Sequence, residues 1–186
     1  MPYLTIFMIA LGLAMDAFAV SLGIATAGEI ETRRGKLRLA AHFGIFQSGM
    51  TALGWVVGGT LMTIIMAYDH WIALILLGYV GFNLIRAGCS KDGKAFKEDP
   101  STGRTMVMLS FATSIDAFAV GLSIAFMNIP IFLSISMIGV VAFALSVAGL
   151  FAGARLGEAF GKRMELIGGL ILIGIGLQVF LSHILG

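Results

Sequence analysis

Two aspartates stand inside apolar stretches of this sequence, at equivalent positions of an internal repeat. Residues 15–25 read MDAFAVSLGIA and residues 115–125 read IDAFAVGLSIA, so eight of eleven positions are identical at an offset of 100 residues. The repeat places Asp16 and Asp116 near the middle of stretches that are long enough to cross a membrane. A charged side chain at that depth costs at least ~2.5–3.5 kcal/mol and marks a functional site by default.

Small residues share a helical face with each aspartate, and they allow neighbouring helices to approach closely. These faces hold Gly12, Asp16, Ala19 and Gly23 in the first copy, and Ala112, Asp116, Ala119 and Ser123 in the second, with Thr113 one turn before Asp116. Symmetry predicts that the two carboxylates face each other, where a divalent cation would relieve their repulsion. Oxygen ligands suit hard ions such as Mg, Ca and Mn. The alternative is that both aspartates are protonated and only hydrogen-bond neighbouring helices.

A second polar face recurs at an offset of 95 residues. It comprises Gly44, Gln47, Thr51, Gly54 and Gly58 in one segment, and Gly139, Ala142, Ser146, Gly149 and Gly153 in the other. We interpret Gln47, Thr51 and Ser146 as supplementary oxygen ligands. Close packing is the favoured alternative for the two hydroxyl groups, but it explains Gln47 less well. The predicted metal site is therefore Asp16, Asp116, Gln47, Thr113, Thr51 and Ser146, with no catalytic residue and no cofactor.

The composition requires a membrane around these residues. Of 186 residues, 59% are hydrophobic and 12% are charged, and the mean hydropathy is +1.00. A soluble domain has roughly 25% charged residues. These values exclude a soluble globule, a disordered chain and a nucleic-acid-binding protein. The single Cys excludes an intrachain disulfide and a cysteine-based zinc cluster.

Apolar segments predict an all-α membrane protein with six transmembrane helices. They lie at about 3–25, 41–66, 71–88, 105–127, 130–155 and 165–185. All 12 Lys and Arg residues fall at or in the three connections 26–40, 89–104 and 156–164. These connections follow the first, third and fifth helices, so they share one side, which the positive-inside rule makes cytoplasmic. Both termini are then predicted to be extracytoplasmic.

The repeats divide the chain into two three-helix units, 1–88 and 105–186, joined by a cytoplasmic linker at 89–104. Because each unit has an odd number of spans, the second unit enters the membrane from the opposite side. Inverted repeats of this kind are typical of secondary transporters, whose substrate site lies near the midplane between the repeats.

The doubled Asp-Ala-Phe-Ala-Val motif, at 16–20 and 116–120 in a six-span chain, resembles the bacterial MntP-type manganese efflux pumps. The resemblance extends to HWIA at 70–73 and to ELIGGLILIGIG at 165–176. It implies export of Mn²⁺ across the inner membrane of a bacterial cell, with Asp16 and Asp116 as functional residues and Mn²⁺ as substrate rather than cofactor. Some members carry Glu in the second helix, where this chain has Gln47.

Three functions could explain these sequence features. The leading hypothesis is a secondary exporter of a divalent cation, most simply Mn²⁺, for which proton antiport fits the paired carboxylates. An intramembrane aspartyl protease would use Asp16 and Asp116 as an acid–base dyad, but hydrolysis needs no inverted symmetry. A scaffold subunit would not need the aspartates. The expected partners are the metal ion and the lipid bilayer, without nucleic acid, and a homo-oligomer remains an open option.

Overall fold

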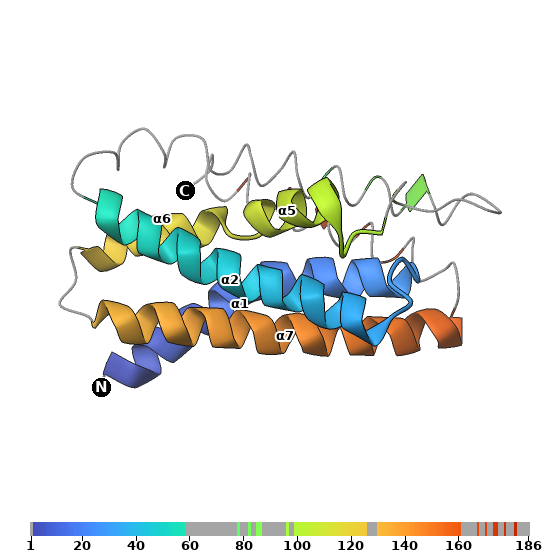
Figure 1. Ribbon diagram of the computed structural model, residues 1–186, viewed down its shortest axis with the longest axis horizontal. Coiled ribbons are helices and arrows are strands. Elements are labelled where there is room, and N and C mark those ends of the chain that lie inside the picture. The colour runs from blue at the N-terminus through green and yellow to red at the C-terminus, as the bar shows by residue number, and fades with distance from the viewer. Residues whose placement is uncertain are drawn as a thin grey trace.

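The computed structural model describes residues 2–58, 99–125 and 130–160, together with single positions elsewhere. Within these ranges the chain forms helices joined by turns (Figure 1). The helices are α1 (Pro2–Thr26), α2 (Arg33–Val57), α5 (Gly103–Ala112), α6 (Ile115–Ala125) and α7 (Ile131–Phe160). This confirms the all-α class. The predicted spans at 71–88 and 165–185 lie outside the described residues, apart from single positions.

Two of the described helices are long and apolar enough to cross a membrane, with spans at Tyr3–Thr26 and Ile131–Leu156. A third span results if α5 and α6 are taken as one bent helix. Helix α2 begins at Arg33 rather than at residue 41, so its first two turns precede the apolar segment. The Thr32 side chain starts the helix there by accepting a hydrogen bond of 3.0 Å from the N–H of Gly35.

The predicted helix at 105–127 is interrupted, which corrects the expectation of one continuous span. Helices α5 and α6 meet at Thr113 and Ser114 with a bend of 42°. The Thr113 hydroxyl donates to the carbonyls of Leu109 and Ser110, and the Ser114 hydroxyl donates to that of Ser110. Hydroxyl groups that bond the preceding turn in this way compete with the helical ladder and bend helices.

Helices at equivalent positions of the two repeats run in opposite directions. Figure 1 shows α1 antiparallel to α5 and α6, and α2 antiparallel to α7. The extensive contacts join α1 to α7, and α2 to α5, α6 and α7. Because of these directions, the C-terminal ends of α1 and α7 lie at the same end of the bundle as the N-terminal ends of α2 and α5. This basic end carries Arg33, Arg34, Lys36, Arg38, Arg104 and Arg155.

Glycines at an offset of 95 residues make matching contacts in this arrangement. A methyl group on Gly54 would press against the carbonyl oxygen of Phe118 in α6, and one on Gly149 against that of Phe18 in α1. The two phenylalanines are themselves equivalent at the offset of 100. Each glycine thus allows a helix of one half to approach the Asp-Ala-Phe segment of the other half closely.

Replacing Gly54 by alanine is expected to destabilise the bundle, because its Cβ would force α2 and α6 apart. Overpacking of this kind costs about 1–3 kcal/mol. The matched control is Gly49→Ala on the same helix, where a Cβ would meet nothing within 4 Å. Thermal unfolding of the purified protein in detergent should show a lower midpoint for Gly54→Ala only. Equal midpoints for the two variants would contradict the close approach of α2 and α6.

Candidate functional site

A polar layer crosses the helices between two apolar clusters. The cluster nearer the basic end, called here the basic-end cluster, contains Ala17, Val20, Ile24, Ala25, Ile30, Leu39, Ala40, Phe43, Phe96, Met106, Leu109 and Leu150. The opposite-end cluster contains Ala10, Leu13, Ala117, Ile124 and Ile138. Between them along the chain lie Asp16 on α1, Gln47 on α2, Asp116 on α6 and Ser146 on α7. Residues predicted from both repeats therefore lie between the two apolar clusters.

Gln47 connects the two halves of the chain at this level. Its side chain is fully buried, and Nε2 donates to the Leu13 carbonyl at 2.8 Å and to the Thr113 carbonyl at 3.2 Å. Leu13 and Thr113 are equivalent at the offset of 100, and each precedes its aspartate by three residues. One amide group therefore bridges the same position of both repeats.

The other end of the Gln47 amide is a buried oxygen that finds no hydrogen-bond donor among the described residues. A buried acceptor without a partner costs about 1–3 kcal/mol, and it is rare in folded proteins. An amide oxygen is also a good ligand for a hard cation. The unpaired Oε1 therefore marks the place where a cation or a water molecule would be stabilised.

Both aspartates are half-buried, and each follows by three residues a carbonyl that Gln47 binds. Asp16 lies within the unbroken helix α1, whereas Asp116 lies in the first turn of α6, directly after the break. The Asp116 carboxylate accepts a hydrogen bond of 2.7 Å from the N–H of Ala117. A carboxylate is favoured at a helix N-terminus, because the unpaired N–H groups there carry partial positive charge. The break thus holds the second aspartate differently from the first.

The predicted hydroxyl ligands differ in their hydrogen bonding. The Thr51 hydroxyl is buried and donates to the Gln47 carbonyl at 2.8 Å, and the Thr113 hydroxyl bonds within α5. The Ser146 hydroxyl is fully buried and has no hydrogen-bond partner among the described residues. The same holds for Ser21 on α1, which the sequence reasoning missed. Among the predicted hydroxyl ligands, Ser146 is thus the one with most capacity to bind an ion.

The side chains at this level are of the types that bind hard divalent ions. No group of three or more His, Cys, Asp or Glu side chains gathers within the described ranges. The available groups are two carboxylates, one amide oxygen, hydroxyls and the helix-break carbonyl of Thr113. These are the ligands of hard divalent ions, which also retain water molecules.

The backbone carbonyls of Leu13 and Thr113 are the part of the site that the sequence reasoning did not identify. The sequence predicts Gln47 as an ion ligand, and the two bonds of its Nε2 group add a second role as a bridge. The repeat relates these two positions, because residues 13 and 113 are separated by its offset of 100 residues. Leu and Thr are different residue types, however, so residue identity did not mark the pair.

Comparisons with known proteins agree with the motif pair. The sequence model of the family described as "Putative manganese efflux pump" matches residues 30–180. Proteins named "Putative manganese efflux pump MntP" are similar over the full chain. That of Citrifermentans bemidjiense is 50% identical, covering 100% of this chain and 99% of the relative. That of Syntrophotalea carbinolica is 46% identical, covering 100% of both. That of Methanosarcina acetivorans is 42% identical, covering 100% and 99%.

No solved structure matches this chain. The family model covers more than half of the chain, and the relatives align along its whole length. The doubled aspartate motif and the membrane-length apolar helices are therefore features of a family member, and this membrane protein belongs to the MntP family of manganese efflux pumps.

Proposed function

We propose that this protein is a secondary transporter that exports Mn²⁺ from the cytoplasm through the polar layer of Asp16, Asp116 and Gln47. The observation that carries the proposal is the buried Gln47 amide, which bridges equivalent carbonyls of both repeats and keeps its own oxygen unpaired. The names of the relatives supply the substrate and the direction of transport.

An architecture of six spans in two inverted repeats forms part of this proposal. It is supported by the opposite directions of equivalent helices and by the exchanged pairing, in which α1 packs on α7 while α6 packs on α2. The described basic residues of the helical segments gather at one end of the bundle, which favours a cytoplasmic location for that end. Both termini are then extracytoplasmic, in the inner membrane of a bacterial cell.

The two apolar clusters fit alternating access to a central site. Within the described helices, packed side chains lie on both sides of the polar layer, which supports an ion site shielded from both solutions. Export of a 2+ ion works against an inside-negative potential, at a cost of ~5 kcal/mol for two charges at 100 mV. A passive pore cannot supply that energy. Proton antiport can, if each aspartate exchanges a proton for the metal.

A protease reading has less support. An acid–base dyad acts on a substrate that enters a water-filled cleft, whereas here one amide group ties both aspartate-bearing segments together in an apolar surrounding. Hydrolysis also gives no reason for the same motif to recur with matching glycine contacts.

The purified protein in lipid vesicles is expected to move Mn²⁺ across the membrane, and to move it faster when a proton gradient of opposite direction is imposed. A manganese-quenched fluorescent indicator inside the vesicles measures this flux. Vesicles without protein set the background, and an ionophore that collapses the gradient tests the coupling. Flux at background would refute the transport proposal, and flux that ignores the proton gradient would refute antiport alone.

A further inference from the structure

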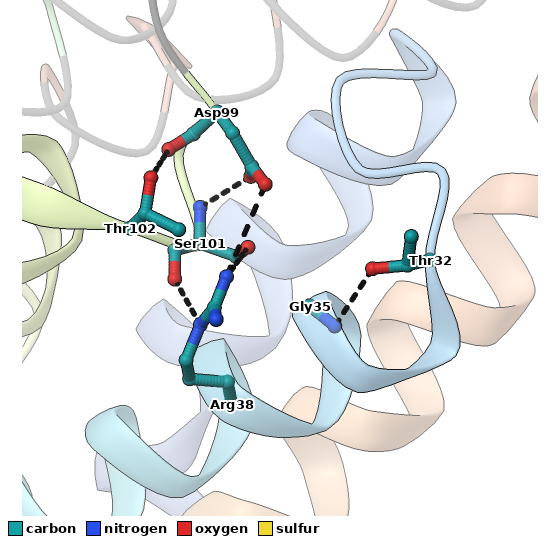
Figure 2. Close-up of polar contacts among 6 residues, drawn as sticks. All are labelled: Thr32, Gly35, Arg38, Asp99, Ser101 and Thr102. Carbon is teal, nitrogen blue, oxygen red and sulfur yellow. Dashed lines mark hydrogen bonds and ion pairs between the residues drawn. The ribbon is translucent and has the colours of Figure 1, made fainter.

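The end of the cytoplasmic linker is bound to the first turns of α2 (Figure 2). Arg38 donates from Nε to the Ser101 carbonyl at 2.6 Å and from Nη2 to the Ser101 hydroxyl at 2.9 Å. Asp99 organises the same turn, because its Oδ1 accepts from the N–H of Ser101 at 2.8 Å and its carbonyl accepts from the Thr102 hydroxyl at 3.0 Å. Ser101 is fully buried as a result.

The linker also contributes to the core. Phe96 is 5% exposed and belongs to the basic-end cluster. That cluster extends from Phe96 to Ala17, the residue after Asp16, and to Phe43, one turn before Gln47. Phe96 therefore adds to the apolar cluster that lies between the polar layer and the basic end of the bundle.

We propose that Phe96 and residues 99–102 form the cytoplasmic gate of the transport path, and that Arg38 is the positioning residue that holds this gate shut. The inference rests on the proposed function, since a gate at this end is needed only if the ion enters from the cytoplasm. Loading the site then requires the linker to lift from α2 and Phe96 to leave the cluster.

The interactions of Arg38 with Asp99 and Ser101 are of a kind that can break and form again. The Arg38 and Asp99 side chains stand 4.0 Å apart and are each 45% exposed, so water screens their attraction. The remaining Arg38 bonds join one side chain to one residue, so a single movement breaks them together. A permanent attachment would be expected to bury its charged groups or to involve several helices.

A reversible crosslink tests whether the linker must move. A Cβ on Gly35 would lie 2.8 Å from the Ser101 hydroxyl oxygen, which is compatible with the ~3.5–4.5 Å between Cβ atoms that a disulfide needs. The variant is Gly35→Cys with Ser101→Cys, made in a Cys89→Ala background. Oxidation should reduce Mn²⁺ flux in vesicles at least about tenfold, and reduction should restore it. Unchanged flux in the fully crosslinked protein would overturn the gate.

A second measurement covers the case in which the crosslinked pair folds poorly, because the new side chain at position 35 also approaches Ile30. Ser21 is buried in α1 on the basic-end side of Asp16, so Ser21→Cys in the Cys89→Ala background reports access from the cytoplasm. Adding Arg38→Gln should increase its labelling by a membrane-impermeant thiol reagent several-fold, whereas Arg34→Gln on the same helix should not. Equal labelling in both variants would contradict the role of Arg38.

These two measurements separate the gate from the transport proposal. If the wild-type protein moves no Mn²⁺, the proposed function fails, but the labelling of Ser21→Cys still reports whether Arg38 closes this end. If the wild-type and crosslinked proteins carry Mn²⁺ equally well, transport stands and the gate is refuted.

Discussion

Asp16→Asn and Asp116→Asn are each expected to reduce Mn²⁺ export to background while protein level and membrane insertion stay unchanged. The amide keeps the shape of the side chain and one oxygen, but it removes the negative charge and the exchangeable proton. Neutral oxygens alone replace the hydration shell of a divalent ion poorly. Both losses should be severe, because in the proposed mechanism each aspartate supplies half of one site.

Manganese tolerance of cells and flux in vesicles measure this effect. Cells with either variant should accumulate manganese and become sensitive to it, while their zinc and copper tolerance stays near that of cells with the intact protein. The matched control is Glu31→Gln, which removes the same charge from an exposed position between α1 and α2 and should leave export intact. If both aspartate variants still protect cells, the aspartates are packing groups and the mechanism is wrong.

Much of the packing could be predicted from spacing alone. The face of Gly44, Gln47, Thr51 and Gly54 is buried as expected, because residues at this spacing share one side of a helix and small side chains favour close contact. The offset between the repeats also anticipated the matching glycine contacts. Helical periodicity indicates which face of a helix is buried, and the repeat offset indicates which positions of the two halves are equivalent.

The break between α5 and α6 could not be predicted in the same way. Thr51 forms the same type of hydroxyl-to-carbonyl bond within the unbroken helix α2, and Ser134 does so in α7. Such residues therefore permit a break without requiring one. The surroundings decide the outcome at Thr113, where the Gln47 amide binds the carbonyl at the break and the Asp116 carboxylate accepts the N–H of Ala117.

The binding of Ser101 to α2 could also not be predicted from the sequence. A charged connection of mixed composition is typical of a solvated loop, and the sequence predicts a cytoplasmic linker at 89–104. In the structure Phe96 is buried in the basic-end cluster, and Ser101 is buried where Arg38, in the first turns of α2, supplies two donors to it. Contacts of this kind join residues 63 positions apart, and no local pattern encodes such a distance.

Gln47→Leu is expected to abolish most Mn²⁺ flux and to lower stability by about 1–3 kcal/mol, the range for removing a buried hydrogen-bonding partner. Leucine fills a similar volume, so the change removes the two Nε2 bonds and the free oxygen rather than the packing. The control is Ser48→Ala, which loses one bond from α2 to the Ile135 carbonyl of α7. It should keep its flux, and wild-type flux in Gln47→Leu would assign Gln47 to packing.

Gln47→Glu separates the two roles of this residue. A carboxylate keeps an oxygen ligand but cannot donate a hydrogen bond to the carbonyls of Leu13 and Thr113. The carboxylate and the two carbonyl oxygens would therefore repel one another in a buried place. Mn²⁺ would relieve that repulsion by lying where the NH₂ group lay. We therefore expect this variant to transport Mn²⁺. Without metal it should unfold at a lower temperature than the wild-type protein. When Mn²⁺ is added, its unfolding temperature should rise by more than that of the wild-type protein. An equal gain in the two proteins would mean that the ion binds away from position 47, and the bridge would then be structural only.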